Sequence, residues 1–158
     1  MLSSGGFTLQ LTSNSMQETR ALGAALAKKL RKGDVVLLDG QMGAGKSEFA
    51  RGIAQGLSIA DNVTSPTFTI LQVYNDGIMP LYHFDWYRIT DASQLYEMGM
   101  DEYLYGDGIA VVEWPQQCEE LIPDNHLSVK IDIGDNENQR IFTFTCAGSF
   151  TELFFGGI

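Results

Sequence analysis

Cysteines, basic residues and long apolar runs are all scarce in this chain of 158 residues. The two cysteines, Cys118 and Cys146, do not have metal-ligand spacing, so we expect free thiols in a reducing compartment. No apolar run is long enough to span a bilayer, and residues 1–6 lack the basic and apolar regions of a signal peptide. These absences predict a cytoplasmic protein that does not contact a membrane.

Positive charge is also scarce, because 10 Lys and Arg residues stand against 20 Asp and Glu residues and the formal net charge is −10. Strong binding to a phosphate backbone needs a patch of Lys and Arg. One small basic group stands near a predicted helix end, where cations favour the helix dipole: Lys28, Lys29, Arg31 and Lys32. We therefore expect no strong, direct nucleic-acid binding by this chain alone.

Residues 40–47 fit the pattern G-x-x-x-x-G-K-[ST], the phosphate-binding loop of nucleotide triphosphatases. The nucleotide-binding candidates in this loop are Gly40, Gln41, Met42, Gly43, Ala44, Gly45, Lys46 and Ser47. The glycines allow a backbone whose N–H groups face a phosphate, while Lys46 would add positive charge at the β- and γ-phosphates and Ser47 would bind Mg²⁺. A buried strand predicted at 34–39 and a helix predicted at 47–57 supply the context that this motif requires.

Hydrophobic periodicity and turn signals predict a single domain over residues 1–158 with an α/β fold. The predicted strands cover residues 7–11, 34–39, 67–74, 79–85, 109–113, 127–133 and 141–145. The predicted helices cover residues 15–30, 47–57 and 91–99, and a further helix begins at Pro115. Turn signals at 75–77 and 134–136 join neighbouring strands into hairpins. We expect a three-layer sandwich like that of P-loop NTPases, with a mixed, mainly parallel central sheet and antiparallel hairpins.

Acidic residues end two of the predicted strands, at the edge where parallel sheets bind their ligands. Glu113 ends an apolar strand, and an acid at this place in P-loop proteins holds Mg²⁺ or its waters. Asp85 could orient the attacking water or join the metal shell, and a helix or turn cap is the alternative. Lys46, Asp85 and Glu113 are therefore the candidate catalytic residues, and Ser47 and Glu113 are the candidate metal ligands.

Other polar residues are open to more than one interpretation. His83 lies mid-strand among apolar residues, so a packed, hydrogen-bonded histidine is favoured over a catalyst. A hydroxyl-rich linker at 64–67 occupies a switch position of many P-loop enzymes, with Thr64 as a candidate nucleotide contact and a plain Ser-Pro turn as the alternative. The guanine-reading pattern Asn-Lys-x-Asp is absent from the sequence, so ATP and ADP are expected rather than GTP.

Several motifs follow one another in an order that resembles the bacterial TsaE family, also called YjeE. They are residues 40–47, Ser65-Pro66-Thr67-Phe68-Thr69, His83-Phe84-Asp85-Trp86-Tyr87-Arg88, Glu97-Met98-Gly99 and Val112-Glu113-Trp114-Pro115. The resemblance runs from the first predicted helix to the last hairpin. The S-P-T-[FY]-T and E-W-P blocks are far more specific than the phosphate loop, which many proteins share.

The resemblance implies a small cytoplasmic P-loop ATPase that is required for threonylcarbamoyladenosine formation in tRNA. It implies that the chain binds the TsaD–TsaB complex, which transfers the threonylcarbamoyl group, and that ATP hydrolysis resets this complex. Lys46 and Ser47 match the family's nucleotide and Mg²⁺ residues, and Glu113 matches its metal-binding acid. Asp85 matches a second essential acid, and Trp114 matches a tryptophan near the nucleotide. The acidic charge fits a protein partner better than strong direct tRNA binding.

The chain departs from the family pattern at two places in and beside the phosphate loop. Gln41 stands where the family usually has an acid, and Ser47-Glu48 stands where it usually has Thr-Thr. Ser47 keeps the hydroxyl that a metal ligand needs. Glu48, the last nucleotide-binding candidate of this segment, is expected to point its carboxylate away from the phosphates, because the two charges repel.

Two other functions remain open from the sequence. A small-molecule kinase shares the phosphate loop but needs a lid that carries arginines over the transferred phosphate. Arg51, Arg88 and Arg140 follow the loop and are scattered, so no such lid is evident. A nucleotide-gated binding module with negligible turnover is not separated from an ATPase by any residue pattern.

Overall fold

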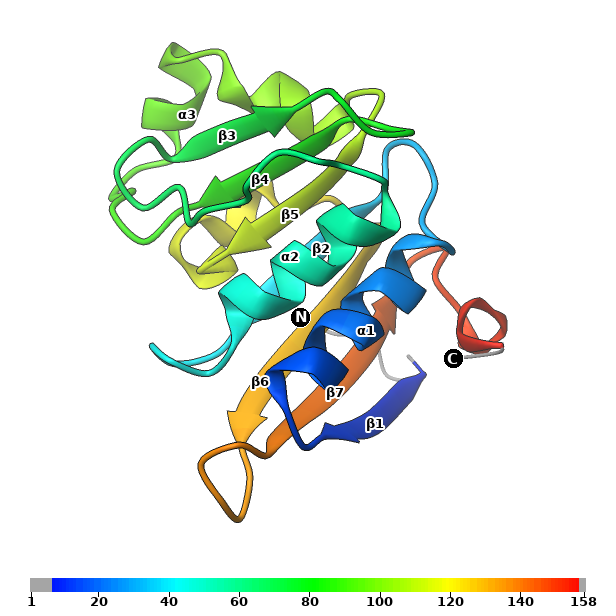
Figure 1. Cartoon of the computed structure of the whole chain (residues 1–158). Helices are drawn as coiled ribbons and strands as arrows, with labels where there is room; N and C mark the ends of the chain where they lie inside the picture. The colour runs from blue at the N-terminus through cyan, green and yellow to red at the C-terminus, as the bar shows by residue number, and fades with distance from the viewer. Residues whose placement is uncertain (1–6, 157–158) are drawn as a thin grey trace.

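The computed structural model describes residues 7–156, which form one seven-stranded sheet with helices around it (Figure 1). The strands are β1 (Thr8–Ser13), β2 (Val35–Asp39), β3 (Leu71–Tyr74), β4 (Leu81–Asp85), β5 (Ile109–Glu113), β6 (His126–Ile133) and β7 (Arg140–Ala147). The helices are α1 (Met16–Ala27), α2 (Lys46–Gly56) and α3 (Ser93–Glu97), with 3₁₀ helices η1 (Met100–Tyr105), η2 (Pro115–Leu121) and η3 (Glu152–Phe155). Residues 1–6 and 157–158 of the predicted domain lie outside the described part.

The strand order is β1-β7-β6-β2-β5-β4-β3, and the sheet is mixed. Its centre is parallel, because β6, β2, β5 and β4 all run in the same direction. β3 is antiparallel to β4 at one edge, while β7 and β1 extend the other side with antiparallel pairings. The predicted α/β class, the parallel centre and the two antiparallel hairpins are confirmed.

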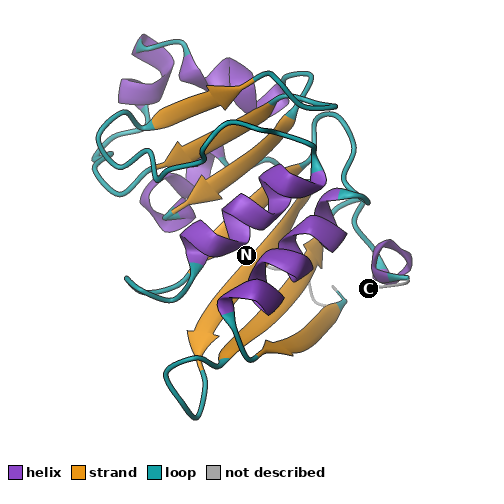
Figure 2. Cartoon of the chain, in the orientation of Figure 1, coloured by secondary structure: helices purple, strands orange, loops and turns teal. Residues whose placement is uncertain are grey.

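Alternating side chains of the central strands build one apolar core on each face of the sheet. Val36 and Leu38 of β2 pack with residues of α1 and α2, which lie side by side over the sheet in Figure 2. Val35 and Leu37 of the same strand pack with residues of α3, η1 and η2 on the opposite face. The molecule is therefore the expected three-layer sandwich, and the phosphate loop connects its central strand to one of the covering helices.

Two glycines let α1 and α2 approach closely, which fixes the helix that follows the phosphate loop. A Cβ atom at Gly23 would lie 2.5 Å from the carbonyl oxygen of Phe49. A Cβ atom at Gly52 would lie 2.2 Å from the carbonyl oxygen of Arg20. Both distances are too short for any side chain, so the helix backbones are in direct contact at this crossing.

The first helix begins at a capping box, which the sequence Ser15-Met16-Gln17-Glu18 forms. The Glu18 N–H donates to the Ser15 hydroxyl over 3.1 Å, and the Glu18 carboxylate accepts from the Asn14 N–H over 2.6 Å. The helix ends at Ala27, which is earlier than the predicted end at Leu30. The helix therefore ends just before the basic group, whose residues lie in the connection to β2.

The first hairpin starts later than its composition predicts. β3 begins at Leu71 rather than at Thr67, because residues 66–70 form a turn. The Ile70 N–H donates to the Pro66 carbonyl over 2.7 Å, and Ile70 has a φ of +70°. The Ile70 carbonyl in turn accepts from the Asp85 N–H over 2.8 Å. This turn brings the hydroxyl-rich linker to the end of β4.

The carboxyl-terminal segment packs on the body of the domain. Phe150 and Phe155 are buried, and the Phe155 ring lies 5.5 Å from the Phe144 ring of β7. The same ring lies 5.8 Å from Phe7, next to β1. The segment therefore covers the end of the core near the antiparallel edge of the sheet.

Candidate nucleotide-binding site

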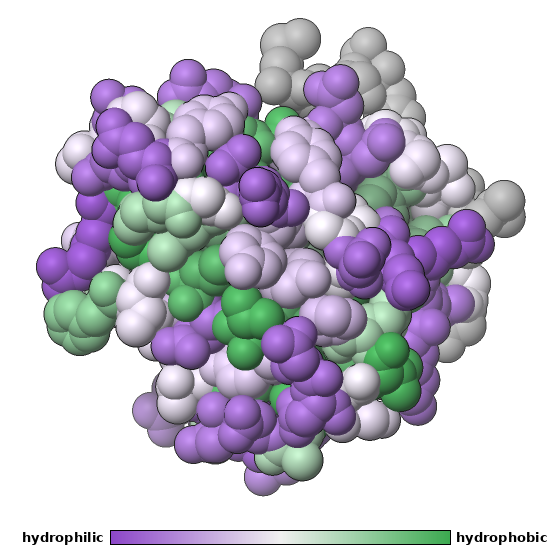
Figure 3. Space-filling model, turned by 90° about the horizontal axis from the view of Figure 1, so that it is seen from above, coloured by the Kyte–Doolittle hydropathy of each residue, from purple (hydrophilic) through white to green (hydrophobic). Residues whose placement is uncertain are grey.

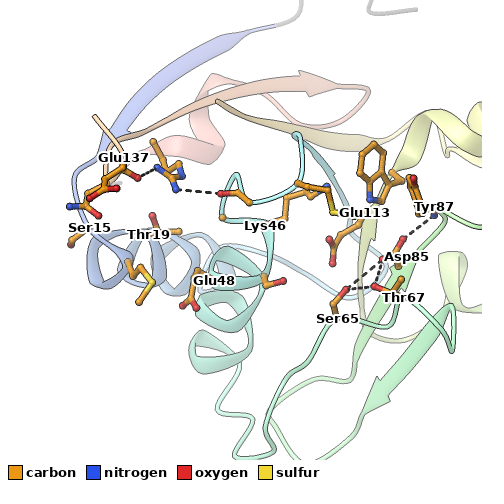
Figure 4. A pocket seen from close by; sticks show the side chains of 18 residues that line it. Ser15, Thr19, Lys46, Glu48, Ser65, Thr67, Asp85, Tyr87, Glu113 and Glu137 are labelled. Carbon is orange, nitrogen blue, oxygen red and sulfur yellow. Dashed lines mark hydrogen bonds between the residues drawn. The ribbon is translucent and has the colours of Figure 1, made fainter. Parts of the chain in front are cut away.

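A cavity of about 490 Å³ opens at the carboxyl ends of β2, β4 and β5 (Figure 4). The phosphate loop and the start of α2 contribute Met42, Gly43, Gly45, Lys46, Ser47 and Glu48. The ends of the neighbouring strands and the linker contribute Ser65, Thr67, Asp85, Tyr87, Glu113 and Trp114. The start of α1 and the β6–β7 connection contribute Ser15, Met16, Thr19, Glu137, Asn138 and Arg140.

The glycines of the phosphate loop are needed for two different reasons. Gly43 and Gly45 have φ angles of +79° and +103°, which residues with a Cβ atom rarely adopt. Gly40 has an ordinary φ, but a Cβ atom there would lie 2.8 Å from the carbonyl oxygen of Ile131 on β6. The loop therefore both turns sharply and lies directly against the neighbouring strand.

Lys46 is held inside the loop by its own backbone and by an aromatic ring. Its Nζ donates to the Gly40 carbonyl over 2.6 Å and lies 4.0 Å from the centroid of the Trp114 ring. Burial lowers the pKa of Lys46, and the carboxylates of Glu113, Asp85 and Asp39 act in the opposite direction. The ammonium group is thus held near the acids at the carboxyl ends of the strands.

The two candidate acids lie side by side, because Asp85 and Glu113 are partners in the parallel register of β4 and β5. Both are buried. Asp85 Oδ2 accepts from the Thr67 hydroxyl over 3.2 Å and from the Ser65 hydroxyl over 3.5 Å, while its Oδ1 accepts from the Tyr87 N–H over 2.9 Å. Asp85 therefore ties the linker to the strand end with one oxygen and caps the following turn with the other.

Glu113 has a different partner, which the sequence did not indicate. Its Oε2 lies 2.7 Å from Nε2 of His83, and both side chains are buried within the β4–β5 pair. The prediction that His83 is a packed, hydrogen-bonded histidine is confirmed. The identity of its partner depends on the register of two strands that are far apart in the sequence.

Glu48 lies at the cavity, but its carboxylate is turned to two arginines. Its oxygens accept from Arg20 Nε over 2.5 Å and from Arg51 Nη1 over 2.6 Å. The hydrogen bond from Arg20 is the largest cause of a lowered pKa for Glu48, and the charge of Arg51 contributes. The negative charge that the chain places beside the phosphate loop is therefore paired within the protein.

Four of the predicted nucleotide contacts do not line the cavity: Gly40, Gln41, Ala44 and Thr64. Gly40 and Ala44 act through their carbonyls, which accept from Lys46 and Arg140. Thr64 is exposed, and its N–H donates to the Tyr74 hydroxyl over 3.3 Å. The hydroxyls that reach the site are those of the next residues in the linker, because the turn at 66–70 directs them toward Asp85.

Arg140 was not predicted as a site residue, yet it braces the phosphate loop from β7. Its Nε donates to the Ala44 carbonyl over 2.9 Å, and its Nη2 donates to the Gly43 carbonyl over 3.3 Å. Its Nη1 donates to the carbonyls of Glu137 and Gln139, so it also holds the β6–β7 connection. No local sequence pattern could have predicted this contact, because Arg140 lies 96 residues after Ala44 in the sequence.

The candidate metal ligands Ser47 and Glu113 both line the cavity. No group of three or more His, Cys, Asp or Glu side chains within residues 7–156 could hold a metal ion by itself. This donor set fits Mg²⁺ bound with phosphate, because Mg²⁺ usually takes few protein ligands and completes its shell with waters and phosphate oxygens. Among residues 7–156, the helices are too short or too polar for any of them to span a bilayer.

The chain is similar in sequence and in fold to known proteins. Residues 13–142 match the family model "Threonylcarbamoyl adenosine biosynthesis protein TsaE". The TsaE protein of Bacillus subtilis is 45% identical over 138 residues, covering 87% of this chain and 85% of that protein, and the TsaE protein of Treponema pallidum is 35% identical over 84% and 98%. A crystal structure of Bacillus subtilis YdiB superimposes with a TM-score of 0.84 at 37% identity, covering 96% of this chain and 94% of that one. The chain therefore belongs to the TsaE family of threonylcarbamoyladenosine biosynthesis proteins.

Proposed function

We propose that this chain is a cytoplasmic, Mg²⁺-dependent ATPase that acts on the TsaD–TsaB complex during threonylcarbamoyladenosine modification of tRNA. Membership of the TsaE family supports the pathway. The observation that carries the ATPase proposal is the convergence of Lys46, Asp85 and Glu113 on the cavity beside the phosphate loop. A lysine and two acids at the ends of parallel strands are the groups that P-loop enzymes use for phosphoryl transfer.

Each residue has a distinct part in the proposed reaction. The loop N–H groups and Lys46 bind the β- and γ-phosphates of ATP. Ser47 and Glu113 would hold Mg²⁺, which would neutralise negative charge on the phosphates. Asp85 lies next to Glu113 and would orient the water that attacks the γ-phosphate. Trp114 covers this end of the loop by packing on the Lys46 ammonium.

The cavity beside the phosphate loop has few positive charges that could stabilise the γ-phosphoryl group during hydrolysis. Arg140 is the only arginine among its lining residues, and its guanidinium is already used by the carbonyls of Ala44 and Gly43. P-loop enzymes with incomplete sites gain activity when a partner supplies the missing groups. We therefore propose slow ATP hydrolysis by the chain alone and faster hydrolysis with TsaD–TsaB.

The same scarcity disfavours the kinase alternative. Arg51 is engaged by Glu48, and Arg88 lies 4.6 Å from the centroid of the exposed Phe68 ring. Within residues 7–156, neither of these two arginines lines the cavity. A nucleotide-gated binding module would use the same contacts to ATP as an ATPase. The two differ only in the rate of ATP hydrolysis.

The substitution Lys46→Ala tests the proposed nucleotide site. Because Lys46 supplies the positive charge of the loop, we expect ATP affinity measured by calorimetry to fall at least tenfold, which corresponds to about 1.4 kcal/mol. Lys28→Ala, which removes an exposed lysine outside the cavity, is the matched control and should bind ATP like the parent. Unchanged affinity in a folded Lys46→Ala protein would exclude the phosphate-loop site, and turnover by the parent separates an ATPase from a binding module.

A further inference from the structure

The pair formed by His83 and Glu113 is a buried polar contact between β4 and β5, at the border between the apolar core and the cavity. The two side chains are 1% and 3% exposed, and Nε2 of His83 lies 2.7 Å from Oε2 of Glu113. On the same face of the sheet, the preceding side chains of β4 and β5 are Leu81 and Val111, which belong to the apolar core under α1 and α2. A carboxylate that is so deeply buried needs a hydrogen-bond donor, because little of its surface is in contact with water.

The hydrogen-bonding pattern identifies the donor. Nδ1 of His83 is buried and has no hydrogen-bond partner within residues 7–156. A proton on Nδ1 would therefore be an unsatisfied buried donor, whereas a bare Nδ1 leaves a less costly unpaired acceptor. The favoured tautomer carries its proton on Nε2 and donates it to the carboxylate of Glu113.

This hydrogen bond uses Oε2 of Glu113 and leaves Oε1 without a hydrogen bond from the described side chains. Glu113 also lines the cavity, so Oε1 belongs to the end of the side chain that a ligand can reach. Asp85, its neighbour, accepts from three donors, whereas Glu113 accepts from His83 alone among the described side chains. Removal of His83 would leave Glu113 without a directional contact.

We propose that His83 is a positioning residue that orients the Glu113 carboxylate toward Mg²⁺ in the nucleotide complex. This inference rests on the proposed ATPase function and adds a role to a residue that binds neither phosphate nor metal. Metal-binding side chains are commonly held by such outer hydrogen bonds, and the loss of one costs about 10- to 100-fold in metal affinity or activity. His83 is distinct from a purely structural residue because its donor atom meets the carboxylate that the metal uses.

The test compares His83→Leu with His83→Gln. Leu cannot donate a hydrogen bond, whereas the Gln side-chain amide can place a donor near the position of Nε2. We expect His83→Leu to weaken Mn²⁺ binding in the presence of ADP by about 10- to 100-fold, measured by electron paramagnetic resonance. We expect ADP affinity in EDTA to stay within about twofold, because the loop and Lys46 do not need the histidine, and His83→Gln should recover most of the Mn²⁺ affinity. His126→Gln, at a histidine outside the cavity, is the control.

Parent-like Mn²⁺ binding by His83→Leu would overturn the inference, as would equal losses for Leu and Gln or an equal loss of metal-free ADP affinity. A parent protein that binds ADP equally with and without Mg²⁺ would instead contradict the proposed function.

Should His83→Leu fail to fold, nitrogen-15 NMR of the His83 imidazole in the parent protein tests the inference. We expect a proton on Nε2 and a shift of this signal with Mg²⁺ and ADP together but not with ADP alone. A proton on Nδ1, or equal shifts in both cases, would overturn the inference.

Discussion

The two acids at the edge of the sheet have different surroundings at the scale of single residues. Asp85 binds the linker through the hydroxyls of Ser65 and Thr67. Glu113 is fixed by His83 and lies near Lys46, where burial lowers the pKa of the lysine and the charge of Glu113 opposes that lowering. Asp85 is therefore suited to act on groups that the linker brings, while Glu113 is suited to hold a cation near the loop.

This difference predicts a division of labour. Glu113→Ala should weaken Mg²⁺-dependent ATP binding as well as turnover, because a metal ligand is lost. Asp85→Ala should lower kcat at least tenfold with a smaller change in ATP affinity, because a group that acts only on the transition state lowers kcat and kcat/KM together. Calorimetry and steady-state kinetics on the two proteins measure both effects. Hydrolysis at the parent rate by Asp85→Ala would reduce Asp85 to a turn cap.

Glu48 shows how one residue can depart from a family pattern without placing an unpaired charge in the site. Its partners Arg20 and Arg51 come from α1 and from the next turn of α2. The ion pairs are partly exposed, so water screens them and their contribution to stability is small. Because folding lowers the pKa of Glu48, the contribution of these ion pairs to stability depends on pH.

We expect Glu48→Gln to lower the free energy of unfolding at pH 7 by about 1 kcal/mol or less. A carboxylate whose pKa is lowered by folding contributes stability above its ordinary value of 4.5, and this contribution disappears as pH falls through the lower folded value. The difference between the parent and Glu48→Gln should therefore shrink below pH 4.5 in urea titrations. Glu119→Gln, at an exposed acid of η2, should show no such trend, and a constant difference at all pH values would contradict the assignment.

At the scale of elements, the position of the phosphate-loop helix depends on its crossing with α1. Gly23 and Gly52 allow the two helix backbones to lie in direct contact, because a Cβ atom at either position would clash with the backbone of the other helix. The substitution Gly52→Ala tests this contact, because its Cβ would lie 2.2 Å from the carbonyl oxygen of Arg20.

Gly52→Ala should destabilise the protein by about 1–3 kcal/mol, the usual cost of overpacking. The clash exceeds the gain of about 1 kcal/mol that Ala brings to an isolated helix. Chemical denaturation measures the change, and Gln55→Ala on the exposed side of α2 is the control, expected within about 0.5 kcal/mol of the parent. A Gly52→Ala protein more stable than the parent would show that the helices separate easily.

The sequence predicted most elements because their signals are local. Apolar runs, the capping box and the hairpin turns each depend on neighbouring residues. The predicted start of β3 at Thr67 was wrong, because residues 66–70 form a turn that is stabilised by hydrogen bonds to Asp85 on another strand. The same reason explains why the partner of His83 and the brace from Arg140 were not predicted: both depend on strand order and register.

At the scale of the whole molecule, charge and surface composition bear on the partner. The net charge is −10, and the view in Figure 3 shows polar and apolar residues mixed over the face it presents. Three apolar side chains in or near the nucleotide site are well exposed: Met42, Phe68 and Tyr87. An acidic molecule with apolar side chains beside its nucleotide site is better suited to a protein partner than to a phosphate backbone.

This leads to the prediction that ATP strengthens binding to TsaD–TsaB and that the complex accelerates hydrolysis. The gain in turnover can reach about a thousandfold or more where a partner completes a P-loop site. Because coupling between binding sites is reciprocal, the complex must tighten ATP binding by the factor by which ATP tightens the complex. Titrations of TsaD–TsaB with and without ATP, and of ATP with and without TsaD–TsaB, measure the two factors independently.

Lys46→Ala provides the control for this coupling. At an ATP concentration that leaves this weakened site mostly empty, ATP should not change its affinity for TsaD–TsaB. Free tRNA should neither bind the isolated chain tightly nor replace the protein complex, since 20 acidic residues against 10 basic ones oppose binding to a polyanion. Full ATPase activity without a partner would mean that the described cavity already holds every group it needs. Tight, salt-sensitive tRNA binding by the chain alone would place the missing positive charge on this molecule rather than on its partner.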